Sequence, residues 1–117
     1  LARAAKIKKL MGADGDRLQV IFISLDPERD TPEILDAYMK AFDPTFVALY
    51  GTLEETAATA KEFDVFYEKV PAGDTYTISH TATSYVYDSN GGLRLGLSTS
   101  LSAEQCTEDL LTVMEVC

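Results

Sequence analysis

The sequence has 117 residues and a formal net charge of −9 at pH 7, with 46% hydrophobic and 25% charged residues. These values are typical of one modest globular domain. The acidic balance argues against binding to nucleic acid, or to an anionic membrane through a basic patch. No stretch reaches the roughly 18 consecutive apolar residues of a membrane helix, and no signal peptide is visible.

Helical and strand patterns alternate along the chain. Residues 1–11 have helical apolar spacing, and residues 18–25 form a β-branched run typical of a strand buried on both faces. The remaining expected elements are a turn at 12–16, a helix at 32–42, a strand at 46–49, a helix at 52–63, extended segments at 65–70 and 76–79 separated by a polar loop, a hairpin of 83–87 with 93–97, and a helix from 102 onward. This order predicts a single domain over residues 1–117, an α/β sandwich of thioredoxin-like type with a mixed sheet.

An acidic loop joins the apolar strand to the next helix. Thr31 is expected to cap that helix and Pro32 to occupy its first position, and Asp30 is also explained as a helix-start residue. Asp26 has no comparable role and lies at the carboxyl end of the strand, where ligands bind in α/β folds, so it is a functional candidate. Arg29 is expected to form an ion pair within the loop, or else to contact a partner.

Two cysteines, Cys106 and Cys117, lie in the last predicted helix. Eleven residues of helix separate their Cα atoms by about 16 Å, beyond the roughly 7 Å that a disulfide allows. They could be metal ligands or redox thiols. However, Cys106 falls on the apolar helix face, and core packing is the favoured interpretation. Cys117 is the terminal residue, and its role stays open.

His80 is the only histidine and lies between an extended segment and the predicted hairpin. It could be a metal ligand or a general base. Position alone favours a structural histidine, because a metal site would need cysteines or carboxylates from elsewhere.

Several stretches, in the right order, resemble the Sco/SenC/PrrC family of copper chaperones from residue 1 to about residue 114. They are Val20–Pro32, Ala37–Phe42, Gly51–Glu55, Tyr67–Val70 and Tyr76–Thr81. The run Asp-Pro-Glu-Arg-Asp-Thr-Pro followed by Tyr-x-x-x-His-Thr is quite specific. The resemblance implies a thioredoxin-like fold, usually tethered by an N-terminal membrane helix and facing the bacterial periplasm or the mitochondrial intermembrane space.

The resemblance also implies that copper is held by a Cys-x-x-x-Cys-Pro pair and one distal histidine, which matches His80. The cysteine pair is expected just before Leu1, together with a central strand between residues 18–25 and 83–87. We therefore expect an N-terminally truncated chain with a gap in its sheet, which binds copper, Cu(I) or Cu(II), only weakly by itself. Strand exchange or homo-oligomerisation would be one way to fill the gap.

Three functions follow as hypotheses. The first is a copper metallochaperone, rather than an enzyme, that serves the dinuclear copper site of cytochrome c oxidase through its copper-bearing subunit or another copper chaperone. The second is a thiol-disulfide oxidoreductase that reduces the cysteines of that site, or a redox sensor. The third is an interaction module that docks through residues 26–30, with Asp26, Arg29 and Asp30 as contacts.

Overall fold

The computed structural model describes residues 1–80 and 83–116, without the side chains of His80, Thr83 and Val116. The chain separates into two compact units, which are described one at a time. The terminal unit holds residues 1–19 and 83–116, and the central unit holds residues 20–80. Among the described residues, no helix is both long and apolar enough to cross a membrane.

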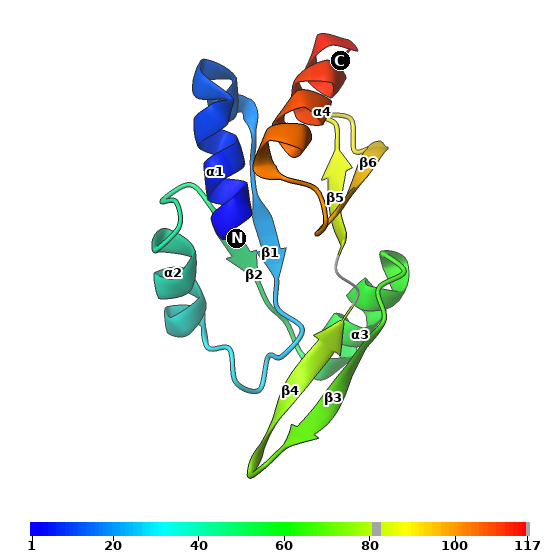
Figure 1. Ribbon diagram of the computed structural model, residues 1–117. Coiled ribbons are helices and arrows are strands. Elements are labelled where there is room, and N and C mark those ends of the chain that lie inside the picture. Colours follow the sequence, from blue (N-terminus) through cyan, green and yellow to red (C-terminus); the bar gives the residue numbers. More distant parts are fainter. Residues whose placement is uncertain (81–82, 117) are drawn as a thin grey trace. The chain divides into compact units, whose positions relative to one another are not determined.

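The terminal unit combines the two ends of the described chain. Its elements are α1 (Ala2–Leu10), the 3₁₀ helix η1 (Gly12–Arg17), β5 (Thr83–Tyr87), β6 (Leu93–Ser98) and α4 (Ala103–Val116) (Figure 1). The predicted turn at 12–16 is thus a short helix. Gly15 is needed there, because a Cβ atom at this position would lie 2.5 Å from the Lys8 carbonyl oxygen. The predicted hairpin is confirmed as the antiparallel pair β5–β6.

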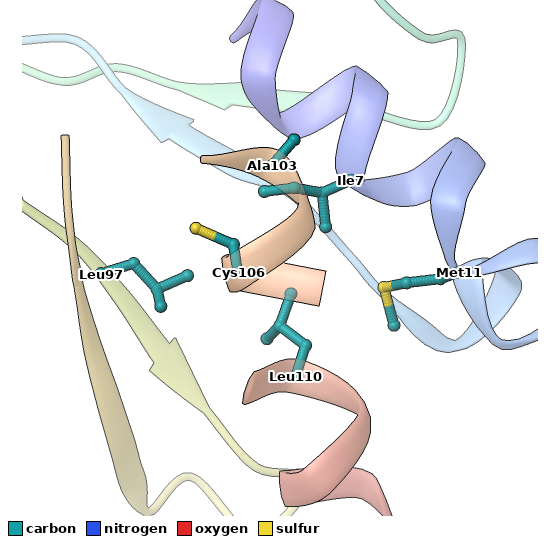
Figure 2. Packing of buried hydrophobic residues seen from close by; sticks show 6 residues of the cluster. All are labelled: Ile7, Met11, Leu97, Ala103, Cys106 and Leu110. Carbon is teal, nitrogen blue, oxygen red and sulfur yellow. The ribbon is translucent and has the colours of Figure 1, made fainter. Parts of the chain in front are cut away.

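A core between α1, β6 and α4 holds this unit together (Figure 2). Its buried members, each at most 5% exposed, are Ile7, Met11, Leu97, Ala103, Cys106 and Leu110. Cys106 has no exposed surface, which confirms the prediction that it packs in the core. Cys117 lies outside the described residues.

The central unit contains a parallel and an antiparallel strand pair. Its elements are β1 (Ile21–Ile23), α2 (Pro32–Lys40), β2 (Val47–Leu49), α3 (Leu53–Glu62), β3 (Tyr67–Ala72) and β4 (Thr75–His80). β1 and β2 run parallel, with Phe22 opposite Ala48. β3 and β4 form an antiparallel hairpin.

The prediction of a long strand buried on both faces at 18–25 is wrong in length and in burial. β1 has three residues, and Ile21 is 54% exposed. In the described part of the chain, β1 pairs with β2 only. Helix α2 lies beside this pair, where the rings of Phe22 and Tyr38 meet edge to face at 6.4 Å. A strand is buried on both faces only where layers cover both sides of its sheet.

The polar loop predicted between the extended segments at 65–70 and 76–79 is a tight hairpin turn. The strands β3 and β4 continue to Ala72 and Thr75, and Gly73 has a φ of +66°. Glycine adopts this left-handed conformation without strain, and Gly-Asp between two extended segments is a signal for a two-residue turn. The hairpin places His80 opposite Tyr67.

Candidate functional site

The acidic loop after β1 is closed by a buried serine. The Ser24 hydroxyl donates a hydrogen bond to Oδ2 of Asp30 at 2.6 Å and accepts one from the Asp26 backbone N–H at 3.1 Å. Ser24 is only 1% exposed. Thr31 caps α2, as predicted, by accepting a hydrogen bond from the Ile34 backbone N–H. Asp30 therefore closes the loop, and the cap itself belongs to Thr31.

Asp26 has a structural role that the sequence pattern did not indicate. The residue is 7% exposed, and its carboxylate accepts hydrogen bonds from Nε of Arg29 and from the Tyr76 hydroxyl, the latter at 2.8 Å. Tyr76 lies on β4, fifty residues further along the chain. Asp26 thus connects the loop to the β3–β4 hairpin.

Arg29 forms the loop ion pair that was predicted, with Asp26, and also reaches β4. Its Nη1 donates a hydrogen bond to the Tyr76 carbonyl oxygen at 2.7 Å. Its guanidinium carbon lies 3.9 Å from the centre of the Tyr76 ring, a distance at which a cation is attracted to the ring face. We call Asp26, Arg29 and Tyr76 the hairpin anchor.

A second connection runs from the same loop to β3. Glu28 and Lys69 form an ion pair at 2.7 Å, with side chains that are 49% and 53% exposed. The Lys69 ammonium also lies 4.7 Å from the centre of the Tyr76 ring. Exposed pairs of this kind stabilise little, about 0–1 kcal/mol, so the anchor with the buried Asp26 is the stronger connection.

Electrostatics keep the anchor in the protonation state that its hydrogen bonds need. Burial alone would raise the pKa of Asp26, but hydrogen bonds from Arg29 and Tyr76 and the charges of Arg29 and Lys69 outweigh burial and lower it. Burial raises the pKa of Tyr76, and the hydrogen bond to the Asp26 carboxylate raises it further. Asp26 therefore stays ionised and Tyr76 protonated at neutral pH.

His80 ends β4, four residues after Tyr76, which is about 13 Å along a strand. Its backbone is in register with Tyr67, and its side chain is outside the described part of the structure. Within the described residues, no group of three or more His, Cys, Asp or Glu side chains could hold a metal ion.

The sequence pattern did not assign functional roles to Ser24, Lys69 or Tyr76. Tyr76 belonged to the Tyr-x-x-x-His-Thr motif, but only the histidine of that motif had a chemical role. Its partner Asp26 is too distant in the sequence for a local pattern to reveal the contact.

The anchor joins the two stretches on which the family resemblance depends most. The sequence model of the family described as SCO1/SenC matches residues 1–115. The chain belongs to this family. Its thioredoxin-like α/β fold agrees with the solved Sco structures, and this part of the fold prediction is confirmed.

Relatives in bacteria and mitochondria share much of the sequence. The chain is 35% identical to an SCO2-like protein of Rickettsia prowazekii over 91 residues, which are 75% of this chain and 44% of that protein. It is 40% identical to the human mitochondrial SCO1 homolog over 76 residues, which are 63% of this chain and 25% of that protein. The chain thus spans less than half the length of these relatives.

A solved relative contains copper. The structure of Bradyrhizobium japonicum ScoI with copper bound has a TM-score of 0.85 and 35% identity to this Sco family chain, and the match covers 96% of this chain and 72% of that one.

Proposed function

We propose that the protein is a copper chaperone that serves assembly of the dinuclear copper site of cytochrome c oxidase. The observation that carries the proposal is the likeness to copper-bound ScoI over 96% of this chain. The SCO1/SenC family match over residues 1–115 supports the same function. Copper is then the cargo of the protein and not a resident cofactor.

His80 is the copper ligand that we propose within this chain. Two thiolates and one imidazole suit copper, and a histidine that can be protonated is a ligand that can be released on transfer. Cys106 is an unsuitable thiolate, because it is fully buried among apolar side chains. The proposal therefore takes both thiolates from the rest of the protein, and His80 alone would bind copper only weakly.

The proposed location follows from the same family. We place the protein at the periplasmic face of a bacterial inner membrane or in the mitochondrial intermembrane space, held by an anchor outside these residues. The mitochondrial name of the human relative supports the second location. The proposed partner is the copper-bearing subunit of the oxidase, or a chaperone that hands copper to it.

The test is Cu(I) binding by the full-length protein, measured in competition with bicinchoninate. We expect His80→Ala to weaken Cu(I) binding at least about tenfold. Loss of a residue that only hydrogen-bonds to a metal ligand already lowers metal affinity by about that factor. Asn90→Ala, in the exposed β5–β6 turn, is the control and should bind copper as the unchanged protein does. Equal Cu(I) affinity with and without His80 would contradict the proposal.

A thiol assay separates this function from the oxidoreductase hypothesis. The unchanged protein and His80→Ala are assayed for reduction of a disulfide peptide that carries the two oxidase copper-site cysteines. The chaperone proposal expects His80→Ala to lose copper affinity. If His80→Ala keeps both its Cu(I) affinity and full reductase activity, the oxidoreductase hypothesis replaces the proposal.

A further inference from the structure

We propose that Asp26, Arg29 and Tyr76 are positioning residues for copper binding, which hold the β3–β4 hairpin so that His80 reaches the metal. The inference rests on the proposed function, because it requires His80 to be a copper ligand. It goes beyond that function by assigning a role to the contacts between the acidic loop and the β3–β4 hairpin.

The hairpin has little apolar burial of its own. Five of the six residues of β3 are exposed, and within the described residues β3 and β4 pack chiefly on each other. Burial of apolar surface is the main force that fixes an element against its neighbours. A hairpin without it depends on polar contacts for its orientation, and the acidic loop contacts the hairpin at Lys69, Thr75 and Tyr76.

The loop that carries Asp26 and Arg29 is firmly held. Asp26 lies three residues after the end of β1, and the Ser24–Asp30 hydrogen bond closes the loop around it. Tyr76 contacts this loop in three ways: its hydroxyl donates to Asp26, and its carbonyl oxygen and its ring both contact Arg29. A buried carboxylate that loses a donor is strongly penalised, so the native state favours the docked hairpin.

The anchor affects copper binding through the fraction of molecules in which His80 is in its binding position. His80 lies on the same strand as Tyr76, four residues further on. When only a fraction of the molecules hold a ligand in its binding position, the apparent dissociation constant rises in inverse proportion to that fraction. Loosening the anchor is therefore expected to weaken copper binding without removing any ligand.

Tyr76→Phe is the sharpest test, because it removes only the hydroxyl that bonds to Asp26. In the full-length protein, we expect this variant to bind Cu(I) about three- to tenfold more weakly in competition with bicinchoninate, the loss that one typical intramolecular hydrogen bond can produce while the other contacts of Tyr76 remain. Tyr50→Phe makes the same chemical change on a ring that is 55% exposed and should leave Cu(I) affinity unchanged.

Measuring the effect of Tyr76→Phe on Cu(I) affinity in the His80→Ala variant as well shows whether the anchor acts through His80. If it does, Tyr76→Phe causes no further loss of Cu(I) affinity there, whereas a general structural effect would weaken binding equally in both backgrounds. Circular dichroism confirms that the variants are folded. Tyr76 is chosen over Asp26 because replacing the buried carboxylate puts folding itself at risk.

Each outcome separates the two proposals. Wild-type Cu(I) affinity in Tyr76→Phe, or an equal loss in both backgrounds, overturns the positioning role, even when His80→Ala weakens binding as the proposed function expects. If His80→Ala itself leaves Cu(I) affinity unchanged, the proposed function fails, and the positioning role fails with it.

Discussion

Asp26 shows how one buried carboxylate organises its surroundings. It lies in the loop three residues after the end of β1, and its carboxylate oxygens accept hydrogen bonds from Arg29 and Tyr76. Asp30 and Glu28 are likewise engaged within the chain, by Ser24 and Lys69. The carboxylates of the loop thus serve internal contacts, and docking of a partner through residues 26–30 stays a prediction.

Replacing this carboxylate should lower stability. Asp26→Asn removes the charge from hydrogen bonds with Arg29 and Tyr76, and we expect a loss of about 1.5–3 kcal/mol in the free energy of unfolding, measured with urea. Asp36→Asn is the control, since Asp36 is an exposed helix residue paired with Lys40. Its loss should be about 0.5 kcal/mol or less. Equal losses in the two variants would contradict the account.

The lowered pKa of Asp26 gives this contribution a pH dependence. The ionised carboxylate stabilises the folded state fully above its ordinary value of 3.8, and the contribution is lost as pH falls through the lower pKa of the folded state. The difference in unfolding free energy between the wild type and Asp26→Asn should therefore shrink as the pH is taken from about 5 to below 3.8. Urea titrations at each pH measure it, and a constant difference would exclude this origin.

Cys106 should be chemically inert in the folded protein. Its side chain is fully buried in the core of the terminal unit, and a thiol reacts only when it is accessible as thiolate. We expect slow alkylation of Cys106 by iodoacetamide in buffer and rapid alkylation in urea, followed by peptide mass spectrometry. Rapid reaction in buffer would show that the thiol is available for redox chemistry.

At the scale of elements, helix α3 is stabilised at its start by a capping box formed by Thr52 and Glu55. The Thr52 hydroxyl accepts a hydrogen bond from the Glu55 backbone N–H at 3.0 Å, and the Glu55 carboxylate accepts one from the Thr52 backbone N–H at 2.9 Å. Hydrogen bonding of the Glu55 carboxylate to the Thr52 backbone N–H, and secondarily to the Thr52 side chain, lowers the pKa of Glu55.

The two glutamates of this first turn allow a matched comparison. Glu55→Ala should lower the free energy of unfolding by about 0.5–1 kcal/mol more than Glu54→Ala, because both lose a charge near the helix start but only Glu55 belongs to the box. Urea denaturation measures the difference. Equal effects would mean that the capping box adds nothing to stability.

Local chemistry explains which elements were predictable. The caps at Thr31 and Thr52 and the turn of the β5–β6 hairpin depend on neighbours within a few residues, and the sequence contains those neighbours. The burial of β1 was mispredicted because it depends on how many layers surround the strand. The β3–β4 hairpin was recognisable from Gly73 and Asp74, but its polar composition suggested a loop.

At the scale of the whole molecule, the fold and the site differ in how far the sequence reveals them. The thioredoxin-like fold followed from the order of elements and from family resemblance, and the Sco structures confirm it. The anchor could not be predicted, because Asp26 and Tyr76 meet across fifty residues. His80 as a copper ligand rests on the resemblance, since position alone favoured a structural histidine.

The most direct test of the central claim is X-ray absorption at the copper edge of the full-length protein loaded with Cu(I). The account predicts sulfur scatterers together with the outer-shell scattering of one imidazole, and it predicts that the imidazole signal disappears in His80→Ala. An imidazole signal that persists in His80→Ala, or one that is absent from the unchanged protein, would contradict the assignment of His80 as the copper ligand.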